Sequence, residues 1–282
     1  MNGIIIFFKP RGMTSHDAVN FFRKKLKIKR IGHTGTLDPN ATGVLPICIG
    51  KATRVSEYLL EADKEYIGEL TLGYKTNTHD MDGSIVDSSN KTVTKEEIIQ
   101  AFTEFEGEIQ QIPPMYSALK FKGKKFYDFA REGKTIKRKP RNIKIYDLNV
   151  LNIIDNKKII FYARCSKGTY IRTLCNDIGK VLGTYGYMSY LIRIGVSRFK
   201  INESIGIKEL KNMDLERIKK NLLPMDLALD SLKSYTVDNN LYSRLVNGLP
   251  IVVKDNFAIL NNLLRVYCNN RFIGIGKIQY KD

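Results

Sequence analysis

The sequence predicts an α+β fold followed by a smaller β-rich region, and three observations support this. The chain has 282 residues, 43% of them hydrophobic, which is enough to bury a sizeable core. Up to about residue 230, segments with strand-like alternation lie between segments with helical spacing. Beyond that point, short apolar runs broken by Asn-Gly and Asn-Asn replace the helical spacing, as in a small β-barrel or sandwich. We therefore expect one domain over residues 1–230 and another over residues 231–282.

A buried strand is expected at residues 3–8, an apolar run that stops in a turn at Lys9 and Pro10. The run is too short for a membrane span and lacks the flanks of a signal peptide, so we expect a cytoplasmic protein. Over residues 15–29 we expect a helix that Thr14 or Ser15 can cap. Its apolar face consists of Ala18, Val19, Phe22 and Leu26. We interpret the basic face opposite as solvent-exposed.

A strand, a turn and a helix are expected next. Residues 64–76 alternate in polarity, with Tyr66, Gly68, Leu70 and Leu72 on one face. Residues 78–87 are interpreted as a polar turn, because the ligand set of a calcium loop is incomplete. A capping box of Thr94 and Glu97 opens a helix that ends before Gly107.

Residues 117–141 differ from their surroundings, because lysines and arginines alternate with phenylalanine and tyrosine. Cations bind phosphates and rings pack on sugars or bases, so this composition suits RNA. An ordinary amphipathic helix would also explain residues 124–133. We expect a helix carried on a mobile basic loop. After it, residues 159–165 are expected to form a strand, and residues 171–182 a helix that Gly183 ends.

Charge is the strongest compositional signal, since 46 basic and 29 acidic residues give a net charge of +17. Lysine-rich composition can arise without a functional cause, but an excess this large favours a polyanionic partner such as nucleic acid. The four cysteines are scattered and are interpreted as buried apolar residues in a reducing compartment. The sequence has no P-loop, metal-ligand cluster or Ser–His–acid order.

Candidate catalytic residues begin with Asp38, which precedes Pro39 in a loop rich in glycine and threonine. Alone, such an aspartate is more often part of an Asx turn than a catalyst, and His33 alone is equally ambiguous. A catalytic aspartate acting on a nucleic-acid base would need a counter-charge and a stacking surface nearby. Arg172 is a candidate for the counter-charge. Tyr66 and Tyr170 are candidates for the aromatic faces.

Residues 31–54 closely resemble the aspartate motif of the TruB family of tRNA pseudouridine synthases, Gly-His-x-Gly-x-Leu-Asp-Pro-x-Ala-x-Gly-x-Leu-Pro, and every fixed position matches. Other stretches resemble the same family in the same order, namely residues 7–19, 111–133, 165–179 and 190–199. The resemblance spans about residues 4–230. The C-terminal tail resembles a PUA RNA-binding domain loosely.

This resemblance implies a pseudouridine-synthase fold with a mixed, largely antiparallel central sheet flanked by helices and loops. It implies a basic RNA-binding insertion at about residues 117–141 and a short PUA-like domain over residues 231–282. The reaction implied is the isomerisation of uridine-55, in the T loop of tRNA, to pseudouridine without cofactor or metal. The expected partner is the T-stem loop of tRNA, and we expect a monomer.

The resemblance also assigns roles to single residues. Asp38 would be the nucleophile, although attack on C6 of the base and attack on C1′ of the ribose both stay open. Tyr66 would stack on the base and help to remove its C5 proton, and Arg172 would pair with Asp38. The substrate-binding residues implied are His33, Tyr170, Leu191, Lys9 and Pro10. Lys9 and Pro10 would buttress the aspartate loop.

The physical chemistry of such a site is consistent with these roles. Extruding a base from a folded loop costs a few kcal/mol, and stacking on a ring returns about 1–3 kcal/mol. An aspartate paired with Arg172 is expected to keep a low pKa. A catalytically silent RNA-binding protein would have no use for Asp38, Tyr66 and Arg172 together. A glycoside-type hydrolase would need a second carboxylate, and no paired acidic motif is seen.

Overall fold

The structure is a computed structural model that describes residues 1–117, 119–121, 123–134, 136–252 and 262–279. The large sheet consists of β1 (Gly3–Lys9), β2 (Ile31–His33), β3 (Thr42–Ile49), β4 (Lys64–Leu72), β7 (Gly107–Gln111), β10 (Arg141–Ile154), β11 (Lys158–Cys165), β12 (Gly186–Val196), β13 (Phe199–Lys200) and β14 (Ile205–Gly206). The helices around it are α1 (Ser15–Leu26), α2 (Ser56–Glu61), α3 (Lys95–Thr103), α5 (Ile171–Val181), α6 (Ile207–Asn212) and α7 (Leu215–Lys220), with 3₁₀ turns η1 (Gly50–Arg54), η2 (Ile201–Glu203) and η3 (Met225–Leu229).

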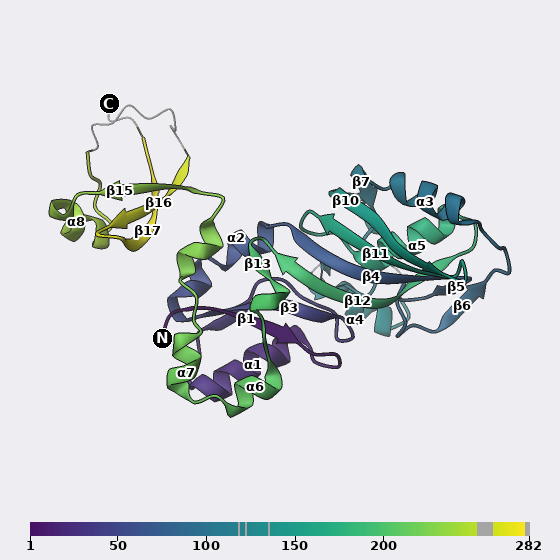
Figure 1. Ribbon diagram of the computed structural model, residues 1–282, viewed down its shortest axis with the longest axis horizontal. Coiled ribbons are helices and arrows are strands. Elements are labelled where there is room, and N and C mark those ends of the chain that lie inside the picture. The colour runs from purple at the N-terminus through teal and green to yellow at the C-terminus, as the bar shows by residue number, and fades with distance from the viewer. Residues whose placement is uncertain (118, 122, 135, 253–261, 280–282) are drawn as a thin grey trace.

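The described strands of the large sheet follow the order β14-β1-β3-β12-β4-β11-β10-β7, with β2 beside β3 and β13 beside β12 (Figure 1). Within that described sheet, β1 pairs with β14 and β3 with β12 in parallel, and the remaining pairs are antiparallel. The predicted fold class, with its mixed and largely antiparallel central sheet, is therefore confirmed.

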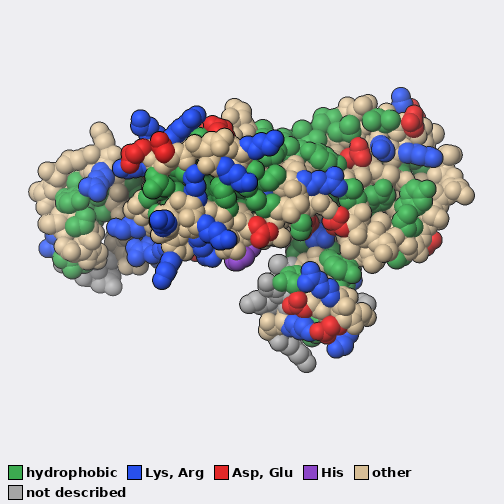
Figure 2. Space-filling view, turned by 90° about the horizontal axis from the view of Figure 1, so that it is seen from below, with side chains coloured by type: hydrophobic (Ala, Val, Ile, Leu, Met, Phe, Trp, Pro, Cys, Tyr) green, Lys and Arg blue, Asp and Glu red, His purple; other side chains and the backbone are tan. Residues whose placement is uncertain are grey.

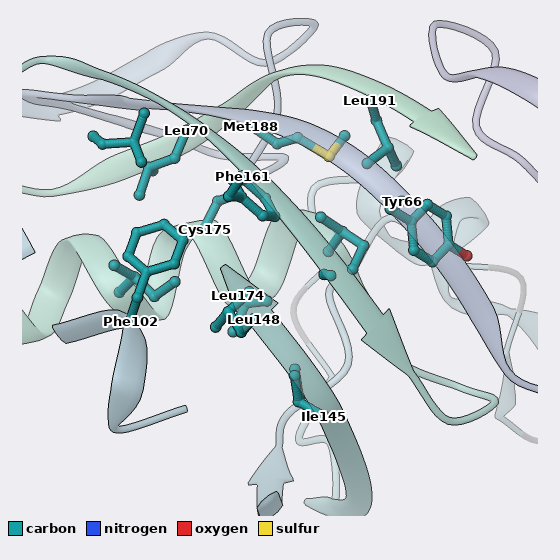
Figure 3. Packing of buried hydrophobic residues seen from close by; sticks show 14 of the residues in the cluster. Tyr66, Leu70, Phe102, Ile145, Leu148, Phe161, Leu174, Cys175, Met188 and Leu191 are labelled. Carbon is teal, nitrogen blue, oxygen red and sulfur yellow. The ribbon is translucent and has the colours of Figure 1, made fainter. Parts of the chain in front are cut away.

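Helix starts follow the predicted capping residues. Thr14 caps α1 and forms a reciprocal capping box with Asp17, and Thr94 does the same for α3 with Glu97. The helix predicted over residues 15–29 is shorter than expected, because Lys27 takes a left-handed backbone conformation with φ of 55°. Its predicted apolar face is buried against the sheet. On the opposite half of the sheet, α3 and α5 pack over β4, β10 and β11 around Phe161 and Phe102 (Figure 3).

Asp38 lies in a loop, as expected, but the loop is short because residues 42–49 form the strand β3. All residues of β3 are buried, and β3 lies in the interior of the sheet between β1 and β12. Its continuous apolar run is typical of a strand covered on both faces. Gly43 in β3 has a φ of 106°, and a Cβ there would lie 2.2 Å from the backbone oxygen of Arg193. The loop itself is confined to residues 34–41, so the adjacent strands fix both of its ends.

The basic insertion forms a hairpin of β8 (Lys120–Phe121) and β9 (Lys124–Lys125), followed by α4 (Phe126–Arg131). The predicted helix is present. Phe121 lies 6.4 Å from Phe126 and 6.3 Å from Phe129, measured between ring centroids. The ring of Phe121 therefore packs against both of the others. A second hairpin, β5 (Tyr74–Thr76) with β6 (Ile85–Ser88), encloses the predicted polar turn.

The C-terminal region contains β15 (Lys233–Val237), η4 (Asn239–Leu241), α8 (Tyr242–Val246), β16 (Leu263–Cys268) and β17 (Arg271–Lys277). In its described residues, a single sheet pairs β15 with β16 in parallel and β16 with β17 antiparallel. The expected barrel or sandwich thus takes the form of one three-stranded sheet there, while residues 253–261 lie outside the described part. No described helix is long and apolar enough to cross a membrane.

Candidate active site

Asp38 lies in the turn between β2 and β3. Its backbone oxygen accepts a hydrogen bond of 3.1 Å from the Ala41 N–H, which closes the turn around Pro39. Ser15, at the start of α1, fixes the preceding residue. The hydroxyl of Ser15 accepts a 2.9 Å bond from the N–H of Leu37 and donates a 3.2 Å bond to its oxygen. The buried side chain of Ser15 therefore anchors the loop that carries the carboxylate.

Lys9, at the end of β1, holds the other side of this loop, and its side chain is fully buried. Its Nζ donates to the backbone oxygens of Pro10 and Met13, at 3.1 and 2.7 Å. A third bond, also of 3.1 Å, reaches the oxygen of Pro39. Burial lowers the pKa of Lys9 to about 8, although the charge of Asp38 opposes the change. Lys9 and Pro10 thus lie where a support for the Asp38 turn is needed.

Arg172, in the first turn of α5, lies between two carboxylates. Its Nη2 is 3.3 Å from Oδ1 of Asp38, and its Nη1 is 3.1 Å from Oδ2 of Asp80. Nη2 also donates a 2.7 Å bond to the backbone oxygen of Tyr116, just before the basic insertion. The side chain of Arg172 is 7% exposed, whereas that of Asp38 is 38% exposed. The carboxylate is therefore the accessible member of the pair.

Asp80 is a site residue that sequence reasoning misses, because residues 78–87 are interpreted there only as a polar turn. The structure buries its side chain. Oδ1 accepts bonds from the Thr78 hydroxyl at 2.6 Å and from the Asp82 N–H at 3.1 Å. This is an Asx-type turn, which satisfies one carboxylate oxygen locally and leaves Oδ2 for Arg172. Only the three-dimensional contact distinguishes Asp80 from an ordinary turn residue.

The ionisation of Asp38 departs from the sequence-based expectation. Burial is the largest influence and raises the pKa of Asp38, and the neighbouring charge of Asp80 raises it further. Arg172 and Lys9 oppose the rise. The expectation of a low pKa is therefore wrong in direction, because burial of the carboxylate and the nearby charge of Asp80 outweigh the attraction of Arg172. The exposed 38% of the Asp38 side chain moderates the effect of burial.

Tyr66 and Leu191 come from the adjacent strands β4 and β12. Tyr66 is 8% exposed and lies at one end of the hydrophobic cluster, with its hydroxyl directed away from it (Figure 3). Leu191 pairs with Gly68 across the two strands and is also buried. Burial raises the pKa of Tyr66 to about 12, while Arg193 opposes the rise. The Tyr66 ring therefore carries a neutral hydroxyl near pH 7.

Tyr170 and His33 occupy different surroundings. The side chain of Gln111 brackets the backbone of Tyr170, with bonds of 2.8 Å to its nitrogen and 3.1 Å to its oxygen. Tyr170 faces the charges of Arg172 and Asp38, and burial raises its pKa. His33 instead faces Arg193 and His16, and burial lowers its pKa.

Asp38 therefore contacts Arg172, and its charge affects the pKa values of Lys9, Tyr66 and Tyr170, whereas the pKa of His33 responds to Arg193 and His16. Within the described residues, no group of three His, Cys, Asp or Glu side chains could hold a metal ion.

Three family models match this chain. The TruB family pseudouridylate synthase N-terminal domain matches residues 23–171. The tRNA pseudouridylate synthase B C-terminal domain matches residues 172–230, and the pseudouridine synthase II TruB C-terminal model matches residues 234–281.

Known proteins resemble the whole chain. Two curated proteins named tRNA pseudouridine synthase B, from Alkaliphilus oremlandii and Clostridioides difficile, are 47% and 45% identical to it. The alignments cover 100% and 99% of this chain and 95% of each relative. A Cbf5-Nop10-Gar1 complex contains a chain that is 29% identical with a TM-score of 0.74, over 98% of this chain and 78% of that one. A chain in an archaeal box H/ACA sRNP Nop10-Cbf5 complex is 27% identical with a TM-score of 0.73, over 98% of this chain and 79% of that one.

Proposed function

This chain belongs to the TruB family of pseudouridine synthases, and from that premise we propose that it converts uridine-55 in the T loop of tRNA to pseudouridine. The relatives named above are tRNA pseudouridine synthases. A net charge of +17 suits an RNA substrate. Lys and Arg side chains predominate on the face shown in Figure 2, over the half that holds α1, α6 and α7. The observation that carries the proposal is the Asp38–Arg172 contact beside Tyr66.

The proposed chemistry uses side chains alone. Asp38 is the nucleophile, and its target is C1′ of the ribose or C6 of the base. The bond between N1 and C1′ breaks, the uracil turns, and C5 bonds to C1′. The C5 proton then leaves and N1 gains one, so the product is an isomer. Arg172 stabilises the charge on Asp38, and Tyr66 stacks on the extruded base.

Other parts of the chain are proposed to bind the RNA. Tyr170 and Leu191 line the base pocket, and His33 holds the base outside the T loop. Lys9 and Pro10 support the Asp38 turn. Residues 1–230 form the catalytic domain, the insertion at about residues 117–141 clamps the T arm, and residues 231–282 act as a short PUA-like module. The enzyme is proposed to work as a monomer in the cytoplasm.

An unmodified tRNA transcript tests this proposal. After incubation with the protein, pseudouridine should map to position 55, and a transcript with cytidine at that position should contain none. Pseudouridine at other positions alone would refute the T-loop assignment. Tight binding of tRNA with no pseudouridine at all would favour the alternative of a catalytically silent RNA-binding protein.

A further inference from the structure

Arg193 is a buried cation that the proposed chemistry does not use. It lies in β12 with 1% of its surface exposed. In the sheet it is opposite Gly43 of β3 on one side and Tyr66 of β4 on the other. Within the described residues, Arg193 forms no ion pair with a carboxylate. Burying an unpaired guanidinium costs several kcal/mol, so other partners must hold it there.

Two of those partners flank the Asp38 loop. Nε of Arg193 donates a 2.7 Å hydrogen bond to the backbone oxygen of Val44, and Nη2 donates a 3.2 Å bond to that of Gly35. Gly35 precedes Asp38 by three residues, and Val44 follows it by six. Gly43 leaves room for this contact, because a Cβ there would overlap the backbone of Arg193. Arg193 therefore ties both ends of the loop to the sheet.

The third partner is Tyr66. It lies directly opposite Arg193 in the neighbouring strand, and the charge of the guanidinium favours the ionised phenol. Asp38 and Cys165 have the opposite effect on Tyr66, because both raise the pKa of its phenol. The remaining titratable groups that face Arg193 are Lys9, Lys64 and His33. Since none of these three is an acid, Tyr66 is the group near Arg193 on which a negative charge would be stabilised.

We propose that Arg193 is a positioning residue that fixes the Asp38 loop relative to Tyr66 and stabilises the Tyr66 phenolate during proton removal. This inference rests on the proposed function. The phenolic proton leaves to solvent, and the phenolate takes the proton from C5 while the C–H electron pair restores the ring double bond. N1 takes up a proton from solvent, so protons balance. Arg193 stays protonated throughout.

Two substitutions test the charge of Arg193. Arg193→Gln keeps donors for the backbone oxygens but removes the charge, whereas Arg193→Lys keeps the charge on a single donor group. We expect Arg193→Gln to lower the single-turnover rate about 100-fold with little change in tRNA affinity. Arg193→Lys should keep most of the wild-type rate. Recovery in Arg193→Lys alone does not exclude a purely structural role, because the ammonium keeps three N–H donors as well as the charge, so the pKa of Tyr66 and the double variant decide between the two roles.

The pKa of Tyr66 provides a readout that needs no turnover. It is measured by NMR on protein labelled with ¹³C at the tyrosine ring, with Tyr66→Phe used to assign the signal. The pKa should rise in Arg193→Gln and stay near the wild-type value in Arg193→Lys. In the Tyr66→Phe background, Arg193→Gln should lower the rate far less than in the wild type.

An unchanged Tyr66 pKa in folded Arg193→Gln would overturn the inference. So would a double variant in which the rate losses of Tyr66→Phe and Arg193→Gln simply multiply. Wild-type protein that makes no pseudouridine in the same assay would instead refute the proposed function.

Discussion

The Asp38 loop and the C-terminal sheet are held in place in opposite ways. Around the loop, three cations are almost completely buried, namely Lys9, Arg172 and Arg193. Each donates hydrogen bonds to backbone oxygens in or near the site. Burying a charge is costly, and it is tolerated where it fixes a geometry that apolar packing would leave loose.

The C-terminal sheet relies on sparse contacts instead. Of its described side chains, only Val237, Leu264 and Cys268 are buried. It meets the rest of the chain through a 2.7 Å bond from the Tyr267 hydroxyl to Asp226, a 2.9 Å bond from Arg265 to the oxygen of Leu232, and the packing of Phe272 against the cluster that includes Ala228 and Leu229. The comparison indicates that substitutions in the first region will act on the chemical step, and changes in the second on RNA affinity.

The largest expected effect is that of Asp38→Asn. The amide is nearly isosteric but is no nucleophile, so the single-turnover rate should fall by roughly 10⁴-fold or more. Affinity for tRNA, measured by filter binding, should change less than about threefold. Substantial remaining turnover would contradict the assignment of Asp38 as the nucleophile.

Asp80→Asn should have the next largest effect, about 10- to 100-fold on the rate, because Arg172 loses one of two charge-assisted partners. The pH profile should also change. Rate should be lost as the pH falls through the raised pKa of Asp38, and removing the negative charge of Asp80 lowers that pKa. The acidic limb of the profile should therefore move to lower pH. Asp82→Asn is the matched control, since Asp82 is exposed, forms no bond to Arg172 and raises the pKa of Asp38 less than Asp80 does, so its shift should be smaller. An acidic limb that moves equally in both variants would argue against the role of Asp80.

The contrast between Asp38 and Asp80 shows how far the sequence leads. A continuous motif identifies Asp38, and periodic patterns identify α1, β4 and α5. Asp80 and Arg193 have no such signature, because their partners come from strands and loops distant in the sequence. The pKa direction of Asp38 could not be predicted either, since it depends on burial and on a second carboxylate that only the fold supplies.

Lys9 should produce an alkaline limb near pH 8, where it begins to lose its proton. A neutral amine has two N–H groups for three backbone acceptors, so the Asp38 turn should loosen and the rate should fall several-fold by about pH 9. Lys9→Met should be slower and lack this limb. A limb that persists in Lys9→Met would assign it to another group.

Unfolding would not explain such a fall. The folded pKa of Lys9 is lowered, so between pH 8 and about 10 the unfolded chain binds more protons there. Over that window this lysine makes the folded state more stable as the pH rises. Thermal unfolding measured across the same pH range checks this.

The smallest effect on chemistry is expected from the C-terminal sheet. A chain that ends at Leu232 should bind tRNA about tenfold more weakly, with a shallower salt dependence, and should keep its single-turnover rate at saturation within about threefold. Circular dichroism controls for folding. Tyr267→Phe, which removes only the bond to Asp226, should cost about 1 kcal/mol of stability and leave affinity unchanged. Unchanged affinity in the shortened chain would mean that this sheet is not an RNA-binding module.

The most direct test is a crystal structure of the Asp38→Asn variant bound to an unmodified T-arm RNA. The uridine at position 55 should be extruded, stacked on the Tyr66 ring, with C1′ or C6 about 3–3.5 Å from the position-38 side chain. A uridine that remains stacked inside the T loop, or lies out of reach of residue 38, would contradict the proposed mechanism.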